Sequence, residues 1–264
     1  MSRHPYLFAF SALWVITLVT PFGPACGWIS DPVEFPLRGD QGEIALGYGM
    51  IRWSDSIAYS PDGQYVATCG SLGTFVWDVE TGEPVRWFQK QYPHAVRFLP
   101  DGKGIVVAGD NAWYVADLQT ESRIRPDYGG PPQHAVSIDV SPDGRWLVTG
   151  RGVGEGGSSH PVDLWDLQTQ RLVRSFEGHD RDARSVEFSP DGRFVLSAVG
   201  IAYPPGAQPV ARLWDVQTGE LVHTFGGHPN QVTDAVFSPD GDQVATIGED
   251  GTVKIWDTET GSVM

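Results

Sequence analysis

The sequence predicts an all-β fold built from five similar units, and two repeated motifs carry this prediction. A Ser-Pro-Asp-Gly tetrapeptide, or a near copy of it, begins at Ser60, Leu99, Ser141, Ser189 and Ser238, in steps of 39, 42, 48 and 49 residues. A Trp-Asp pair follows in four of the units, at Trp77, Trp165, Trp214 and Trp256. A period of about 40–50 residues with a hairpin signature is typical of propeller blades, which are four-stranded sheets arranged around an axis.

The fifth unit, residues 228–261, shows the predicted strands most clearly. Its first strand alternates apolar residues with small or polar ones, as a half-buried strand does. The turn Pro239-Asp240-Gly241 ends this strand, because Pro presets φ, Asp bonds its own backbone and Gly adopts the left-handed conformation. The sequence thus predicts three strands joined by tight turns, at residues 232–238, 243–247 and 252–256, and a further turn where a fourth strand would begin.

This unit resembles the WD40 repeat, with Gly227-His228 at its head and Trp256-Asp257 at its end. In that family a His, a Ser or Thr, a turn Asp and the Trp form a buried hydrogen-bonded tetrad. The matching positions here are His228, Thr246, Asp250 and Trp256. A buried indole N–H and a buried imidazole both need hydrogen-bond partners. The resemblance therefore implies a WD40-type β-propeller of about five four-stranded blades, in which His228 is structural.

The earlier units depart from the family pattern. The second unit has Ala116-Asp117 in place of Trp-Asp, so its tetrad cannot form. A Gly-His pair heads only the last two units, at His179 and His228, while His94 and His134 lie at other offsets and receive no tetrad role. We therefore expect the early blades to depend more on apolar packing.

The third and fourth units carry extra residues between their second and third strands, at 151–161 and 201–209. The resemblance implies that this loop lies on the same face as the turn into the first strand. Binding residues concentrate on loops that a rigid scaffold presents. The predicted partner-binding face comprises Arg52, Asp55, Gln91, His94, Arg151, Glu155, His160, Arg181, Arg184, Tyr203, Asn230 and Thr233.

Residues 1–25 resemble a secretory signal peptide, with a basic start, an apolar run at 5–20 and small residues Gly23 and Ala25 before a cleavage site. The alternative is an uncleaved membrane anchor, although the run is slightly short for a span of about 20 residues. Both interpretations place the protein outside the cytoplasm: exported (periplasmic, cell-envelope or secreted) or membrane-anchored. Exported relatives of the repeat family occur among bacteria, so an exported bacterial protein is expected.

Cys26 directly follows the predicted cleavage site and is a candidate for lipidation. The preceding Gly-Pro-Ala lacks the large apolar residue of the bacterial lipoprotein motif that it resembles. The second cysteine, Cys69, is expected to be a small core residue. Residues 26–53 lead into the repeats, and 33–48 are the candidate segment to supply the outer strand of the last blade. Residues 54–264 hold the five repeats.

The formal net charge of −15 argues against partners that are nucleic acids or anionic lipid surfaces, both of which require Lys and Arg. The membrane is then contacted only through the N-terminal segment. Solubility alone explains much of this charge. The sequence contains none of the common nucleophile, zinc-protease or phosphate-loop motifs. The Asp residues of the repeated turns are turn formers, and His160 alone is no metal site.

Catalytic residues, cofactors and metal ligands are therefore not predicted. The favoured function is a non-catalytic scaffold that binds a protein or peptide. Two alternatives remain open. One is a propeller enzyme or ligand sensor with a site in the central channel. The other is a partial propeller completed by self-association, for example as a homodimer, which would protect an open strand edge.

Overall fold

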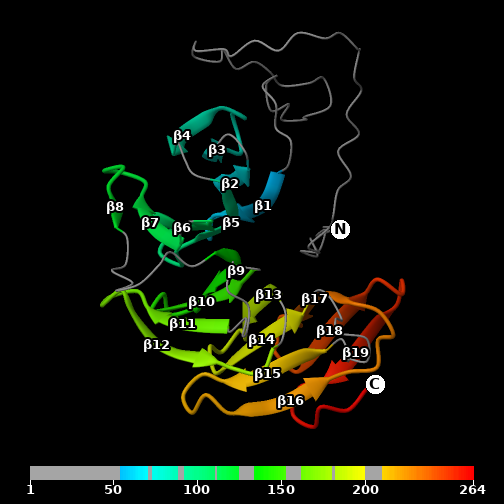
Figure 1. Cartoon of the computed structure of the whole chain (residues 1–264). Coiled ribbons are helices and arrows are strands. Elements are labelled where there is room, and N and C mark those ends of the chain that lie inside the picture. Colours follow the sequence, from blue (N-terminus) through cyan, green and yellow to red (C-terminus); the bar gives the residue numbers. More distant parts are fainter. Residues whose placement is uncertain are drawn as a thin grey trace, which may run out of the picture. The chain divides into compact units, whose positions relative to one another are not determined.

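The computed structural model describes residues 54–70, 73–88, 92–110, 112–124, 134–152, 162–179, 182–199 and 210–264. All of these residues belong to one compact unit of the chain, which lies within Phe35–Met264. Within these described residues every regular element is a strand (Figure 1). The predicted signal peptide, Cys26 and the candidate closing strand at 33–48 lie outside the described residues.

The strands form five antiparallel sheets, which confirms the predicted all-β, WD40-type class. The first sheet contains β1 (Ser54–Tyr59), β2 (Tyr65–Gly70), β3 (Gly73–Asp78) and β4 (Pro84–Phe88). The second contains β5 (Pro93–Phe98), β6 (Gly104–Gly109), β7 (Ala112–Asp117) and β8 (Arg123–Ile124). The third contains β9 (Ala135–Val140), β10 (Trp146–Arg151), β11 (Val162–Asp166) and β12 (Arg171–Phe176).

The fourth sheet contains β13 (Ala183–Phe188), β14 (Phe194–Val199), β15 (Ala211–Asp215) and β16 (Leu221–Phe225). Among the described residues, the fifth contains three strands, β17 (Val232–Phe237), β18 (Gln243–Gly248) and β19 (Val253–Asp257). At the position of a fourth strand, Val263 forms an isolated bridge with Trp256, and the Met264 N–H donates to the Ile255 carbonyl at 2.9 Å.

The Ser-Pro-Asp-Gly turns join the first and second strands of four sheets through the same local hydrogen bonds. In the fifth sheet the Ser238 hydroxyl donates to Asp240 Oδ1 at 2.5 Å and accepts from the Gln243 N–H at 2.9 Å. Gly241 has a φ of 80°, a conformation that a side chain would strain. The Asp of each Trp-Asp pair closes the following turn: Asp257 Oδ1 accepts from the backbone N–H and the hydroxyl of Thr260, both at 2.7 Å.

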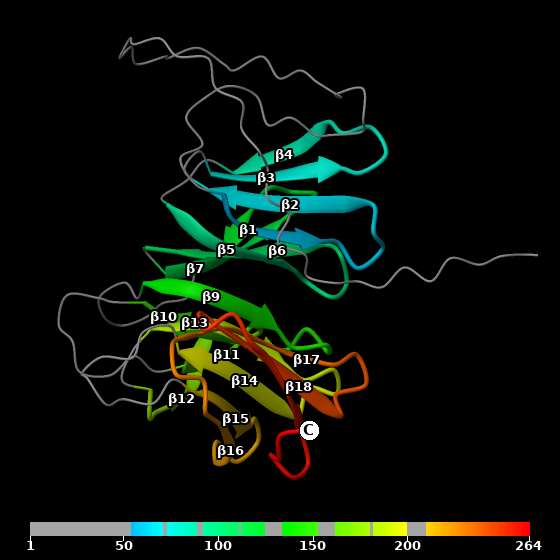
Figure 2. The same ribbon diagram turned by 90° about the vertical axis from the view of Figure 1, so that its right-hand side faces the viewer.

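Apolar side chains fill the space between each sheet and the next. Four clusters of buried residues join the first sheet to the second, the second to the third, the third to the fourth and the fourth to the fifth. The first strands of successive sheets also contact one another, β1 with β5, β5 with β9, β9 with β13 and β13 with β17. Successive sheets accordingly follow one another in chain order from cyan to red (Figures 1 and 2).

The second sheet shows how apolar packing replaces the tetrad. All six residues of β6 are buried. In the second sheet, Val107 on β6 is equivalent to Thr246 on β18. Ala116 on β7 is equivalent to Trp256 on β19, and both Val107 and Ala116 are buried. The other four sheets retain a bond from the Trp indole to a Ser or Thr hydroxyl, at 2.8–3.1 Å.

Truncation of Leu213 tests the packing between the fourth and fifth sheets. Leu213 is fully buried in that cluster, so Leu213→Ala should lower the free energy of unfolding by about 2–5 kcal/mol, because a cavity remains. The exposed Leu172 on β12 provides the matched control, and Leu172→Ala should change stability by about 0.5 kcal/mol or less. Chemical denaturation measures both values, and equal effects would contradict the assigned core.

Candidate binding face and inner-strand site

The four tetrad residues predicted in the fifth unit lie in one chain of hydrogen bonds. The Trp256 indole N–H donates to Thr246 Oγ1 at 3.0 Å, and Thr246 Oγ1 lies 2.9 Å from His228 Nε2. His228 Nδ1 lies 3.0 Å from Asp250 Oδ2. The Asp250 carboxylate accepts from His228 Nδ1–H, and the Thr246 hydroxyl, which accepts from the indole, can donate its own proton to Nε2. Hydrogen bonds from Thr252, and then from His228, lower the pKa of Asp250 to about 2. With both ring nitrogens engaged, His228 serves the fold.

The fourth sheet has a variant of this arrangement in which an arginine replaces the aspartate. His179 Nε2 lies 2.7 Å from Ser197 Oγ, which also accepts from the Trp214 indole at 2.8 Å. The other ring nitrogen faces Arg212 Nη1 at 3.2 Å. Burial and the Arg212 charge lower the pKa of His179 to about 3, so this ring is neutral. It is therefore a structural acceptor for the arginine.

Replacing the central hydroxyl of the tetrad should be costly. Thr246→Val leaves the Trp256 N–H and His228 Nε2 buried without partners, and the free energy of unfolding should fall by about 2–4 kcal/mol. Thr224→Val on the exposed face of β16 is the control for the same substitution in a strand, and should have little effect. Denaturant midpoints measure both; a loss no larger than that of the control would show that the tetrad adds nothing.

Six residues of the predicted binding face belong to the described part of the chain. Asp55, His94, Arg184 and Thr233 lie near the starts of the first strands of their sheets. Arg151 ends β10, and Asn230 precedes β17. Arg184, Asn230 and Thr233 are exposed. Arg151 is half-buried, with Nε 3.9 Å from Asp163 Oδ2. The other six, Arg52, Gln91, Glu155, His160, Arg181 and Tyr203, lie outside the described residues.

The structure also aligns three charged residues that the sequence reasoning missed. Arg97, Asp139 and Glu187 are each the fifth residue of the first strand of their sheet, on β5, β9 and β13. Each stands two residues before the repeated tetrapeptide, where the first and fifth units have Ala58 and Val236. A charge at this position in three consecutive units is the signal that would have identified them.

These charged side chains tie each first strand to the next. Arg97 Nε lies 3.4 Å from Asp139 Oδ1, and Asp139 Oδ2 accepts from the Phe188 N–H at 2.8 Å. Glu187 Oε2 in turn accepts from the Phe237 N–H at 2.8 Å. The carboxylates thus satisfy backbone donors at the edge of the neighbouring strand.

Burial dominates the acidity of both carboxyl groups. It raises the pKa of Asp139, with the Arg97 charge and the backbone hydrogen bonds opposing it. Burial also raises the pKa of Glu187 to about 7, helped by the charges of Asp139 and Asp234, while the Phe237 N–H and Arg97 act in the opposite direction. Glu187 therefore exchanges its proton near neutral pH. Within the described residues, both groups contact strand backbone, as structural ties do.

The raised pKa of Glu187 predicts a pH dependence of stability. The pKa of Glu187 is 4.5 in the unfolded state and about 7 in the folded state. Between these pH values the unfolded state has lost the proton and the folded state still holds it. The contribution of Glu187 to the free energy of unfolding therefore falls as pH rises. Glu187→Gln removes the charge. The change that it causes in the free energy of unfolding should therefore be more favourable at pH 8 than at pH 5, by about 1–3 kcal/mol. Glu220→Gln, at an exposed position, is the control. Urea unfolding at both pH values measures the difference, and identical pH profiles for wild type and Glu187→Gln would contradict the assignment.

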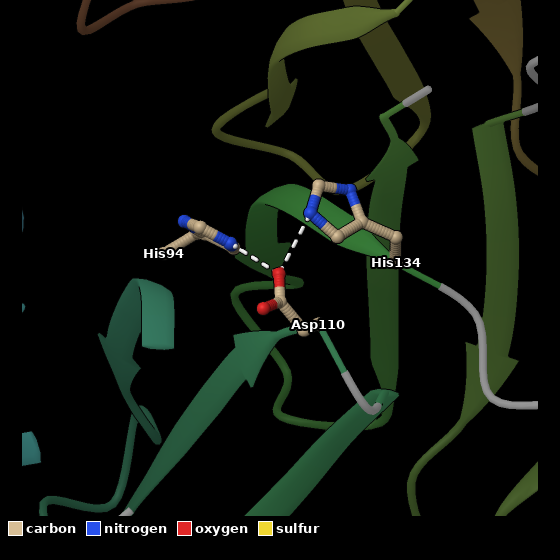
Figure 3. Close-up of side chains that lie close together, drawn as sticks. All are labelled: His94, Asp110 and His134. Atoms are coloured by element: carbon tan, nitrogen blue, oxygen red, sulfur yellow. Dashed lines mark hydrogen bonds and ion pairs between the residues drawn. The ribbon is translucent and has the colours of Figure 1, made fainter. Parts of the chain in front are cut away.

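Two histidines and an aspartate meet where the second sheet packs against the third (Figure 3). His94 Nε2 lies 2.8 Å and His134 Nε2 lies 2.9 Å from the same oxygen, Asp110 Oδ1. The two imidazole rings are 5.0 Å apart in an edge-on arrangement. His134 Nδ1 is buried with no hydrogen-bond partner, so Asp110 is the polar partner of this ring. Among the described residues, these three form the one group of His, Cys, Asp or Glu with metal-ligand spacing.

The comparison with protein families decides the classification. The sequence model of the WD40 family, described as "WD domain, G-beta repeat", matches residues 55–78, 128–158, 170–215 and 219–257, which is more than half of the chain. The chain belongs to the WD40-repeat family. The match skips residues 79–127, which include all four strands of the second sheet, where Ala116 replaces the family tryptophan.

Solved structures share the fold of this WD40 protein. One is a chain of hydrazine synthase from Kuenenia stuttgartiensis, with a TM-score of 0.69 and 20 % sequence identity, over 83 % of this chain and 67 % of that one. At this identity the likeness concerns the fold alone. A comparison with curated protein sequences gives no significant match. In the part of the WD40 protein that the structure describes, no helix has the length and apolar character needed to cross a membrane.

Proposed function

We propose that this WD40 protein is a non-catalytic scaffold that binds a protein or peptide at the end of the sheets where their first strands begin. The observation that carries the proposal is membership of the WD40 family, whose propellers typically mediate protein interactions. The first strands of the sheets are paired and packed, so the residues at their starts, such as Arg184 and Thr233, are presented from a rigid scaffold, which lowers the entropy cost of binding.

The exposed side chains at this end support the proposal. Arg184 near the start of β13, with Asn230 and Thr233 at β17, presents a cation and short polar groups on two sheets whose first strands are in contact. Beside them the Ser185 hydroxyl donates to Asp234 Oδ1 at 2.5 Å. Arginine is favoured in protein interfaces because its guanidinium makes several directional hydrogen bonds.

The non-catalytic part of the proposal rests on how the titratable groups are used. His179 and His228 are held by the hydrogen bonds of the fold, and Asp139 and Glu187 accept from strand backbone. The family is generally non-catalytic. The hydrazine synthase chain shows that the same fold also occurs within an enzyme.

Export or membrane tethering is a further part of the proposal, supported by the apolar run at 5–20 and the small residues before Cys26. The intact mass of the protein from its native host tests it. A mass beginning at Cys26 supports cleavage, an added acyl mass supports lipidation, and retention of residues 1–25 in a membrane fraction supports an anchor. A full-length, unmodified protein confined to the cytoplasm would refute export.

Site-specific photo-crosslinking in the native host tests the binding face. A photoreactive residue at position 184 should capture a defined partner, while the same residue at position 145 should not. Arg145 adjoins the Ser-Pro-Asp-Gly turn of the third sheet, at the opposite end of the first strands. With the purified partner, Arg184→Ala or deletion of residues 153–159 should weaken binding about tenfold or more, and Arg145→Ala should not. Equal crosslinking at both positions would contradict the proposed face.

A second candidate, self-association, has its own observation. On the first sheet, Ile57 and Tyr59 are 63 % and 67 % exposed, on the face opposite the cluster shared with the second sheet. Ile247 and Val253 on the fifth sheet are exposed as well. Apolar surface of this kind favours a covering partner. Sedimentation distinguishes the candidates, because a concentration-dependent dimer that Tyr59→Ser disrupts would support pairing between copies, and a monomer at all concentrations would exclude it.

A further inference from the structure

We propose that His94, Asp110 and His134 form a binding site for a divalent transition metal of the zinc class, placed between the second and third sheets. The inference rests on the positions of these three side chains and does not depend on the proposed scaffold function. It also assigns a role to His94 and His134, which do not belong to a tetrad.

Three separate segments of the chain bring the ligands together. His94 is the second residue of β5, and Asp110 directly follows β6. Because β5 and β6 pair with Pro93 opposite Gly109, these two side chains start from adjacent backbone positions. His134 directly precedes β9, and the contact between β5 and β9 brings it to the same point. The three side chains converge from two sheets (Figure 3).

The distances suit a metal ion after a small adjustment. The three ligand atoms lie within 4.8 Å of one another, and both imidazole nitrogens lie within 2.9 Å of one carboxylate oxygen. Around tetrahedral zinc, ligand atoms bonded at about 2.0 Å are about 3.3 Å apart. Side-chain rotations would have to lengthen the two nitrogen–oxygen distances from 2.8 and 2.9 Å to about this value. Three protein ligands leave a fourth position for water or another ligand.

The ligand types select the metal class. Two imidazoles with one carboxylate suit Zn²⁺ and its neighbours such as Co²⁺, whereas Mg²⁺ and Ca²⁺ prefer sites made wholly of oxygen. The side chains of His94, His134 and Asp110 are 27 %, 31 % and 40 % exposed, so an ion can reach them from solvent. The protein's net charge of −15 raises the local concentration of cations.

The backbone around the ligands is constrained. Tyr92, two residues before His94, has a φ of +39°, which is uncommon for a residue with a side chain. A Cβ on Gly109 would lie 2.3 Å from the Tyr92 carbonyl oxygen, and a Cβ on Gly152 would lie 2.4 Å from His134 Nδ1. Glycine at both positions therefore lets the two segments approach. Such preorganisation reduces the cost of binding an ion.

The cluster is specific to this place in the chain. His94 is the second residue of its first strand, and the other sheets have Asp55, Val136, Arg184 and Thr233 at that position. His134 is the residue just before a first strand, and the fourth and fifth sheets have Asp182 and Gln231 there. The repeat therefore does not require these histidines. They occur beside the sheet that lacks the tetrad and that the family match skips.

Calorimetric titration of the full-length, tag-free protein tests the site after chelator treatment and dialysis. Zinc chloride should bind with one equivalent per chain and raise the melting temperature. Cobalt chloride should give the visible absorption of a four- or five-coordinate ion with nitrogen ligands. A large excess of magnesium chloride should displace neither metal.

Single variants assign the ligands. His94→Gln, His134→Gln and Asp110→Asn should each weaken zinc binding about tenfold or more and abolish the cobalt spectrum. Asp110→Asn is the most informative, because its carbonyl oxygen can still accept both imidazole N–H groups, and its melting temperature without metal reports folding. His223→Gln is the matched control, since His223 contacts the Glu259 carbonyl far along the chain. It should leave both metals bound.

Two results would overturn the proposal. The first is wild-type protein that binds no zinc at concentrations of about 100 µM. The second is zinc binding of equal strength in wild type and in all three ligand variants, which would place the ion elsewhere. Either result would leave the cluster as a metal-free hydrogen-bonded link between the two sheets.

Discussion

Each sheet in this chain has two apolar faces, and its own short turns cover neither of them. A sheet is therefore stable only against a neighbour, and the four clusters between successive sheets meet this requirement with buried residues from both sides. Stability is then shared between adjacent units, as in other repeat proteins. First strands also present backbone N–H donors toward the preceding sheet, and Asp139 and Glu187 accept from two of these donors, Phe188 N–H and Phe237 N–H.

This use of carboxylates explains why chemically similar residues have opposite acidities. Asp62 and Asp240, in exposed turns, accept hydrogen bonds from a serine hydroxyl and a backbone N–H, and these bonds lower their pKa values. Asp139 and Glu187 also accept backbone N–H bonds, but burial outweighs the bonds and raises their pKa values. Hydrogen bonds in the turns stabilise the ionised form of Asp62 and Asp240, whereas burial disfavours ionisation of Asp139 and Glu187. The two sets of acids therefore respond to different pH ranges.

The fold could be predicted because its signals are local. A turn such as Pro239-Asp240-Gly241 specifies a hairpin within a few residues, and the tetrad positions lie at fixed offsets within one unit. The cluster of His94, Asp110 and His134 could not be predicted in the same way, because its members belong to two units. They meet only because β6 pairs antiparallel with β5, and because β9 contacts β5 from the next sheet. His94 was expected on the binding face, but its partners follow from tertiary packing.

The second sheet shows where sequence variation is tolerated. Its tetrad positions hold Val107 and Ala116, and complete burial of β6 compensates for the missing hydrogen bonds. The interior of each sheet must remain apolar or paired, so substitutions there are limited by packing. At the starts of the first strands the same register position carries Asp55, His94, Val136, Arg184 or Thr233. Residues of such different charge and size occupy one position because packing does not determine it. The ion site and the partner-binding face that we propose both lie at this end of the sheets, where the repeat constrains the residue type least.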